Sequence, residues 1–272
     1  MTSDSLFDGI AEIYDRARRP YPPRLFDDVF NYLGEHPQEP ESPGALAAPR
    51  TVAAVEIGPG TGQATGPLLA RGVTVAAVEP GPRLAVFLRN KFAAEQRLVV
   101  INERFEEAPL PVGLADLVLA ATSFHWVDSE VRYEKTLELL RDGGALAVIG
   151  TNQIASSADR GYFAASQPIY DRHFRGEFVT ELPGEDVTPP EVGELLENAA
   201  FEGVELFRYR WDQCYSTAEY LELVRSYSRT QQLEAGAREA FIADLASFID
   251  REFEGYVVRP LVLTLLLARK RW

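Results

Sequence analysis

Cysteine is almost absent from this sequence, with Cys214 the single example among 272 residues. One cysteine excludes an internal disulfide bond and a zinc site built from thiolates. Histidine is also rare, and its three members, His36, His125 and His173, stand apart along the chain. Neither a histidine pair nor an acidic cluster occurs at ligand spacing, so we expect no metal site.

Long apolar runs are missing as well. The longest, LVLTLLLA at residues 261–268, is much shorter than the ~20 residues that a membrane helix needs. We interpret it as a buried strand. No charged and then apolar leader follows Met1, so the sequence predicts a cytoplasmic protein.

Positive charge is in deficit, because 27 Lys and Arg residues face 41 Asp and Glu residues, for a formal net charge of −14. An acidic surface repels phosphate backbones, so nucleic acids and anionic membranes are poor partners. Hydrophobic residues make up 46% of the chain and charged residues 25%, the balance of an ordinary globular protein. The oligomeric state stays open.

Short apolar strands alternate with helical segments from Thr51 onward. Such alternation predicts an α/β fold whose parallel sheet is covered on both faces. The expected strands are 51–57, 73–79, 97–103, 115–122, 145–151, 203–215 and 256–270, and the expected helices include 62–72, 82–95, 130–144, 189–201, 216–233 and 237–253. The first 50 residues are predicted to be N-terminal helices and a proline-rich linker, residues 51–151 the binding core, and residues 152–272 helical segments plus C-terminal strands, all within a single domain.

A glycine-rich turn follows the first predicted strand, in the stretch VEIGPGTGQAT. Its glycines are Gly58, Gly60 and Gly62, whereas a dinucleotide-binding fingerprint requires a third glycine at the position of Gln63. A pyrophosphate would also lie near Glu56, and the two like charges would repel. S-adenosylmethionine carries a sulfonium and an ammonium group, so a carboxylate beside a close glycine turn favours it.

The second predicted strand ends in a carboxylate, Glu79, about 20 residues beyond the turn, where adenosine-binding sheets bind the ribose hydroxyls. NAD sites use the same device. Glu79 therefore predicts an adenosine ligand, and Glu56 with the glycine spacing selects the cofactor.

The motifs VEIGPGTGQAT, AVEPGPRL, FEEAPLP with ADLVLAATSFHWVD, and LRDGGALAVIG resemble, in this order, those of class I S-adenosylmethionine-dependent methyltransferases. The resemblance is nearest to the trans-aconitate methyltransferase-like, small-molecule group, and FDGIAEIYDRARRPYP resembles the N-terminal helix and turn of that group. It implies a Rossmann-like sheet of seven mostly parallel strands with an antiparallel C-terminal hairpin. It also implies helical lid segments, which we place at residues 155–182 and 217–253.

The resemblance assigns cofactor contacts position by position. It places Glu56, Gly58, Pro59 and Gly60 around the methionine end, Glu79 on the ribose, and Pro80, Phe105 and Glu106 around the adenine. Backbone carbonyls near Ala121 approach the cofactor, and Tyr14 and Arg18 close over the methionine moiety. Arg104 stands where relatives often have an acidic residue, and Arg19 and Pro20 depart from their usual Pro-Gly.

His125 is the candidate catalytic base, because it follows the fourth strand at the ligand-binding edge of such sheets. A histidine that only fixes its loop explains it too. Tyr21, Phe124 and Trp126 are the candidate acceptor contacts, with core packing as the alternative for Phe124 and Trp126. Arg160, Arg172, His173 and Arg175 fit either an anionic substrate or the charged face of a helix.

We therefore expect S-adenosylmethionine-dependent methyl transfer to an oxygen or nitrogen atom of a small molecule, possibly a carboxylate. A non-catalytic adenosyl-binding protein and a nicotinamide-dependent oxidoreductase are the alternatives. The second would need the missing third glycine and tolerance of Glu56.

Overall fold

The computed structural model describes residues 12, 15–16, 20–34, 51–174 and 181–272. The chain divides into two compact units made of segments that are not contiguous in sequence. The core unit comprises Pro20–Gly150, Pro189–Phe207 and Thr264–Trp272, and the helical unit comprises Met1–Arg19, Thr151–Thr188 and Arg208–Leu263. The predicted division at residues 50 and 151 stays a prediction.

Seven strands form one sheet in the order β3-β2-β1-β4-β5-β7-β6. They are β1 (Ala53–Ile57), β2 (Thr74–Val78), β3 (Leu98–Ile101), β4 (Ala115–Ala121), β5 (Leu140–Gln153), β6 (Phe201–Ser216) and β7 (Tyr256–Lys270). The first five strands pair in parallel, with Glu56 of β1 opposite Ala77 of β2 and Leu119 of β4. The predicted sheet is confirmed.

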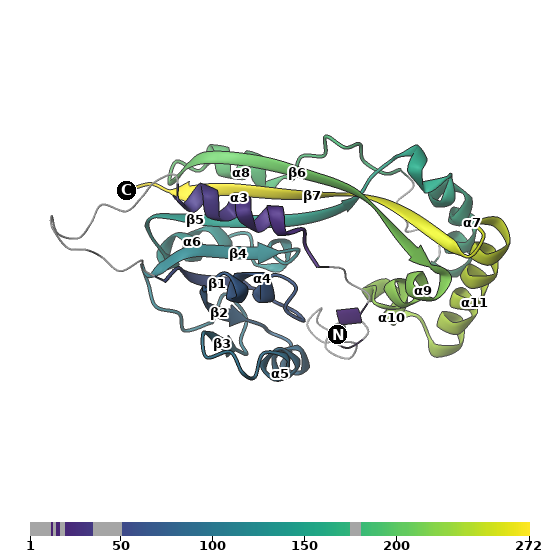
Figure 1. The fold of residues 1–272 in the computed structure, drawn as a ribbon, viewed down its shortest axis with the longest axis horizontal. Helices are drawn as coiled ribbons and strands as arrows, with labels where there is room; N and C mark the ends of the chain where they lie inside the picture. The colour runs from purple at the N-terminus through teal and green to yellow at the C-terminus, as the bar shows by residue number, and fades with distance from the viewer. Residues whose placement is uncertain (1–11, 13–14, 17–19, 35–50, 175–180) are drawn as a thin grey trace. The chain divides into compact units, whose positions relative to one another are not determined.

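β7 runs against both of its neighbours, as its arrow shows in Figure 1. On one side, Ile154 donates its N–H to Pro260 at 3.1 Å and Lys270 donates to the Leu140 carbonyl at 2.8 Å. On the other side, Arg271 donates its N–H to Ala200 at 2.9 Å. The C-terminal hairpin of β6 and β7 is therefore antiparallel, as predicted.

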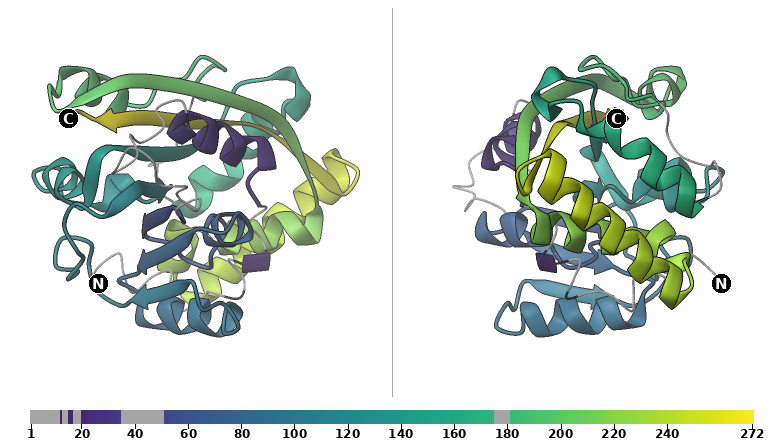
Figure 2. Two further views of the ribbon diagram at one scale, coloured as in Figure 1. Left: turned by 60° about the vertical axis from the view of Figure 1, so that its left-hand side comes forward. Right: turned by 90° about the vertical axis from the view of Figure 1, so that its right-hand side faces the viewer.

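Helices cover both faces of the sheet in the core unit. They are α3 (Pro23–Gly34), α4 (Thr65–Ala70), α5 (Pro82–Lys91), the 3₁₀ turn η1 (Phe124–Trp126), α6 (Arg132–Leu139) and α8 (Glu191–Glu197). Figures 1 and 2 show α3 and α4 on one face and α8 on the other. Alternate strand residues such as Val55, Val118 and Leu146 pack with Leu139 of α6 and Leu195 of α8. This double coverage explains why the strands read as continuous apolar runs.

The helical unit has a hydrophobic cluster of its own. Its helices are the 3₁₀ turn η2 (Ser157–Asp159), α7 (Tyr162–Phe174), α9 (Thr217–Arg225), α10 (Ser228–Gln232) and α11 (Ala235–Glu252). Phe241, Leu245 and Ile249 of α11 pack with Tyr162 and Ile169 of α7 and with Leu223 of α9. A capping box formed by Ser216 and Glu219 begins α9. That these helices act as a lid stays a prediction.

Several element boundaries differ from the sequence expectation. The expected helix 189–201 ends at Glu197, and the expected helix 216–233 is two helices, α9 and α10. The helix expected to continue to Gly143 and Gly144 ends at Leu139, because Leu140 pairs with Ala115 and starts β5. The helix expected to begin at Gly62 begins at Thr65, because the three preceding residues belong to the glycine turn. No helix among the described segments is long and apolar enough to cross a membrane.

Candidate ligand site in the core unit

The glycine turn after β1 has a backbone that only glycine adopts easily. Gly58, Gly60 and Gly62 have φ angles of +61°, +57° and +89°, the left-handed region in which a side chain is strained. A Cβ on Gly58 would lie 2.7 Å from the Ser123 Cβ, and one on Gly62 would lie 2.5 Å from the Phe92 ring. A Cβ on Gly60 would meet nothing within 4 Å. At Gly58 and Gly62 the absence of a side chain therefore lets the turn pack against neighbouring residues, whereas Gly60 faces open space.

Glu79 ties the ends of β1 and β2 together. Its carboxylate accepts the Gly60 N–H and the Gly81 N–H, each at 2.9 Å, and its side chain is buried. Gly58 also donates its N–H to the Val78 carbonyl at 2.9 Å. Because an ionised carboxylate can accept about four hydrogen bonds, two backbone donors do not exclude ligand hydroxyls. The structure thus brings Glu79 and Gly60 together.

Glu56 is a buried carboxyl group, only 1% exposed, at the end of β1. Thr65 at the start of α4 donates its hydroxyl to Glu56 Oε2 at 2.7 Å. Burial is the main cause that raises the pKa of Glu56, the Thr65 hydrogen bond opposes it and the nearby Glu79 adds to it, for a resulting pKa of about 7. Two carboxyl groups so close in a dry environment favour a cation beside them.

The loops after β2 and β3 are held by a residue that the sequence did not single out. Asn102 donates its side-chain amide to the carbonyls of Glu79 and Pro80, at 2.8 and 3.1 Å. Phe105 is buried at 3% exposure under the Lys135 ammonium group, 5.5 Å from its ring centre. Glu106 accepts the Asp128 N–H at 3.0 Å. Pro80 and Glu106 are partly accessible, whereas Phe105 belongs to the hydrophobic core.

The carboxyl end of β4 lies next to the carboxyl end of β1 in the parallel sheet. Ala121 and Thr122 are partly exposed, and Thr122 has a φ of +56°, which is rare for a residue with a branched side chain. Ser123 donates its hydroxyl to the carbonyl of Ile57, and so joins the ends of β4 and β1. Neither Ser123 nor Asn102 was predicted, because a small polar residue in a loop carries no distinctive sequence signal. Their position directly after strands of a parallel sheet is the signal that could have found them.

His125 and Trp126 lie on η1, directly after this strand end. Both side chains are exposed, and their rings are 5.0 Å apart. Partial burial lowers the pKa of His125, with Glu191 opposing and Arg132 reinforcing the shift. The imidazole is therefore neutral near pH 7 and able to accept a proton.

The other residues predicted to contact the acceptor or the cofactor differ in their environments. Phe124 is 1% exposed and packs edge to face on Tyr133, 5.4 Å between ring centres, so core packing accounts for it and an acceptor contact does not follow. Tyr21 is half-buried against Phe26, at 6.4 Å. Tyr14 and Arg18 lie outside the described residues.

These residues suit a ligand that carries a positive charge and an adenosine. The buried Glu56 supplies negative potential, Glu79 offers acceptors to hydroxyl groups, and Gly60 leaves room for a close approach. A phosphate fits poorly, because two carboxyl groups lie where it would bind.

Comparison with known families matches residues 55–148 to a methyltransferase domain. That segment runs from β1 into β5 and includes every part of the site described above except Tyr21.

Among curated proteins, an uncharacterized methyltransferase of Mycobacterium tuberculosis is 34% identical over 136 residues. The match covers 50% of this chain and 48% of that protein, so the chain spans about half the length of the curated relatives it matches. A ribosomal RNA small subunit methyltransferase A of Synechococcus is 49% identical over 57 residues, which is 21% of this chain and 20% of that protein.

Solved structures share the fold. A candidate type II methyltransferase of Anaeromyxobacter dehalogenans aligns with a TM-score of 0.53 and 21% identity, over 93% of this chain and 97% of that one. A phosphoethanolamine N-methyltransferase of Haemonchus contortus, in complex with phosphomonomethylethanolamine and S-adenosylhomocysteine, aligns with a TM-score of 0.54 and 12% identity. That alignment covers 100% of this chain and 61% of the other.

Proposed function

From the match of residues 55–148 to a methyltransferase domain, we propose that this protein transfers a methyl group from S-adenosylmethionine to a small-molecule acceptor. The observation that carries the proposal is the pair of buried carboxyl groups, Glu56 and Glu79, beneath a turn whose Gly60 faces open space. The neighbour solved with S-adenosylhomocysteine supports the choice of cofactor.

Each part of the site has a role in holding the cofactor. Glu56 provides negative potential for the cationic methionine end, and Glu79 accepts hydrogen bonds from the ribose hydroxyls while it holds Gly60 and Gly81 in place. Pro80 and Glu106 would hold the adenine, and Ala121 would offer its backbone carbonyl. When bound, S-adenosylmethionine supplies a methyl carbon that is already activated by the sulfonium charge.

Because the methyl group is activated, the protein contributes mainly by alignment. Holding two reactants in line corresponds to effective molarities that can reach ~10⁵ M or more. His125 then takes the proton of an oxygen or nitrogen acceptor, for which its lowered pKa suits it. If the acceptor is already a carboxylate, no base is needed. Trp126 and Tyr21 are the proposed acceptor contacts, and the exposure of Trp126, 54%, leaves its ring accessible.

A small acceptor is favoured over RNA by the charge of the chain, −14, since RNA binding gains most of its affinity from cationic contacts to phosphates. The ribosomal RNA methyltransferase relative matches over only 57 residues, 21% of this chain.

Calorimetry with the whole chain tests the cofactor. We expect S-adenosylmethionine and S-adenosylhomocysteine to bind and NAD to give no heat, because Glu56 and Glu79 disfavour a pyrophosphate. Tight NAD binding would contradict the proposal.

Incubation with methyl-labelled cofactor and a panel of small acids, phenols and amines tests the reaction. We expect label to pass to one chemical class and not to ribosomal RNA. Cofactor binding without transfer to any member would favour the non-catalytic alternative, and labelled RNA would overturn the small-molecule assignment.

A further inference from the structure

Arg259 is a charged residue in the middle of an apolar strand of the helical unit. It follows Val257 and precedes Pro260 and Leu261 on β7, and those three side chains are buried. The Arg259 side chain is half-buried, so part of it remains accessible. Burial of a guanidinium group is unfavourable unless an anion accompanies it. The position therefore raises the question of what neutralises this charge.

The neutral groups around Arg259 hold it firmly. Its Nε and Nη2 both donate to Gln153 Oε1 on β5, at 3.1 and 2.8 Å, and its Nη1 donates to the Tyr227 hydroxyl at 2.6 Å. These bonds use three of the five guanidinium N–H groups, and the two that remain are one on each terminal nitrogen. A carboxylate accepts just such a pair side by side.

No carboxylate of the described residues forms an ion pair with Arg259, and the charged or titratable groups that act on it most are tyrosines. They are Tyr170 from α7, Tyr215 from β6, Tyr220 from α9, and Tyr227 between α9 and α10, and Tyr162 of α7 also senses the Arg259 charge. Burial raises the pKa of Tyr162, Tyr170 and Tyr220. These hydroxyls therefore remain protonated and do not neutralise the guanidinium.

Tyr162 adds a second, independent irregularity. Its side chain is 2% exposed, and its hydroxyl lies near the Tyr220 hydroxyl without reaching hydrogen-bond geometry. The ring packs edge to face on Tyr220, 5.3 Å between centres. A buried hydroxyl without a partner is rare in proteins and destabilises the folded state unless a further group satisfies it.

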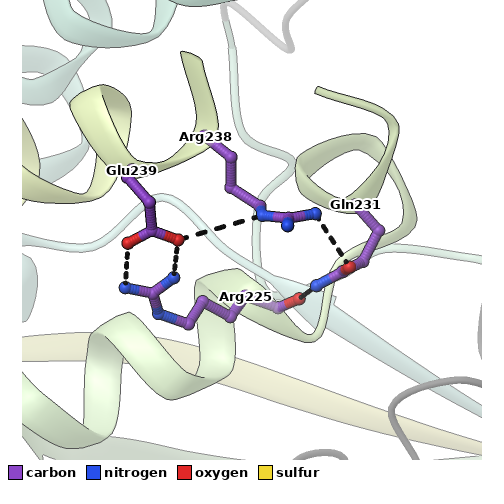
Figure 3. Close-up of polar contacts among 4 residues, drawn as sticks. All are labelled: Arg225, Gln231, Arg238 and Glu239. Carbon is purple, nitrogen blue, oxygen red and sulfur yellow. Dashed lines mark hydrogen bonds and ion pairs between the residues drawn. The ribbon is translucent and has the colours of Figure 1, made fainter. Parts of the chain in front are cut away.

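Several other arginines of the helical unit pair with carboxylates. Arg225 forms a double hydrogen bond with Glu239, at 2.7 and 2.9 Å (Figure 3). Arg172 and His173 bond Asp244, and Arg160 pairs with Glu254, so these three of the residues that the sequence indicated for an anion already have carboxylate partners. Arg175 lies outside the described residues. Arg259 differs from the arginines that pair with carboxylates.

The segment that carries Tyr227 is itself fixed. Gln231 donates to the Arg225 carbonyl at 2.6 Å and accepts from Arg238 at 3.2 Å, which ties α9, α10 and α11 together (Figure 3). Tyr227 therefore has a defined position from which to orient Arg259.

We propose that the helical unit contains a binding site for the carboxylate group of a small organic acid, with Arg259 as the double donor and the Tyr162 hydroxyl as a further donor. A carboxylate carries one negative charge and matches the single guanidinium. A phosphate dianion would leave a negative charge among protonated phenols. The aromatic surroundings suit an organic body on the acid. The site goes beyond the proposed function, since it concerns binding and not methyl transfer.

Calorimetry and thermal denaturation of the whole chain test this site with benzoate, succinate and citrate. Benzamide, which has the shape of benzoate without its charge, and inorganic phosphate are the comparison ligands. We expect at least one acid to bind saturably and to raise the melting temperature, with benzamide and phosphate binding about tenfold more weakly or not at all.

Variants assign the site to its residues. Arg259→Gln should weaken acid binding by at least about tenfold, since a double hydrogen bond to a charged group is lost, and Arg259→Lys should restore only part of it. Arg225→Gln, whose arginine already has Glu239 as a partner, should bind the acid like the wild type. Tyr162→Phe should weaken binding severalfold while the melting temperature without ligand stays the same or rises.

Three results would overturn the proposal: no saturable binding of any acid, phosphate binding more tightly than every acid, or equal losses in Arg225→Gln and Arg259→Gln. S-adenosylhomocysteine binding is measured in the same samples. Its failure with acid binding intact would count against the proposed function, and the reverse outcome would count against this site alone.

Discussion

Glu56 is a carboxyl group whose ionisation the folded protein resists. Its pKa is about 7 when folded, against an ordinary value of 4.5, so between these values the folded state holds a proton that the unfolded chain has released. The native state binds more protons, and the free energy of unfolding therefore falls as pH rises through this window. The loss can reach ~3 kcal/mol and is complete above the folded pKa.

Urea denaturation at pH 5 and pH 8 measures this effect. Glu56→Gln has no proton to lose and can still accept the Thr65 hydroxyl, so it should gain ~1–3 kcal/mol relative to the wild type between the two pH values. Glu107→Gln, a change at an exposed glutamate, should follow the wild type. Parallel pH profiles for the wild type and Glu56→Gln would show that Glu56 ionises normally.

Glu79 should control cofactor affinity more than stability. Each hydrogen bond to a charged group is worth ~1.5–3 kcal/mol, so Glu79→Ala should weaken S-adenosylhomocysteine binding at least about tenfold in calorimetry, with circular dichroism showing a folded protein. Glu79→Gln keeps the shape of the side chain, but its amide nitrogen cannot accept a hydrogen bond, so it can accept from only one of the Gly60 and Gly81 N–H groups. Its affinity for S-adenosylhomocysteine should lie between those of the wild type and Glu79→Ala. An unchanged affinity would place the ribose elsewhere.

At this scale, the sequence could predict residue types but not their partners. The carboxylates at Glu56 and Glu79 follow from charge and spacing. The hydroxyl of Thr65, the amide of Asn102 and the hydroxyl of Ser123 act through loop geometry, which no local pattern encodes. Arg259 was read as part of an apolar strand, although a lone arginine in such a run is itself a signal of a buried partner.

Among the elements, the glycine turn allows an effect on stability to be distinguished from an effect on cofactor binding. Gly58 and Gly60 have nearly the same φ, so alanine at either position meets the same backbone strain of ~1–2 kcal/mol. Only Gly58→Ala also places a Cβ 2.7 Å from Ser123, while Gly60→Ala meets open space. Gly58→Ala should therefore lower the melting temperature more, and Gly60→Ala should lose cofactor affinity out of proportion to its stability. Thermal denaturation and calorimetry on both variants measure this. Equal losses in both properties would mean that Gly60 does not face the ligand.

The strands were predictable because their apolar periodicity is long and consistent, and the capping box at Ser216 marked the start of α9. The ends of the helices were less predictable. Leu140 continues a helical pattern in sequence, yet pairing with Ala115 places it in β5, since tertiary contacts outweigh a propensity difference of a few tenths of a kcal/mol.

For the whole molecule, the sequence does not indicate how its segments combine into the two units. Both units are assembled from segments separated in sequence, and β5, β6 and β7 contribute residues to both. Local sequence patterns indicate contiguous segments only. They do not indicate contacts between residues more than 100 positions apart, such as the hydrogen bond of Lys270 with Leu140.

The place of β7 in the sheet also dictates an order of events on the ribosome. β6 has β7 as its sheet neighbour, and β7 inserts between β6 and β5. Residues 201–216, which form β6, are therefore synthesised before β7, the strand with which they pair. The edge of β5 that pairs with β7 also stays exposed until β7 has been synthesised. Unpaired edges invite association between chains. Until β7 is made, β5 and β6 therefore both lack the neighbour that they share in the native sheet.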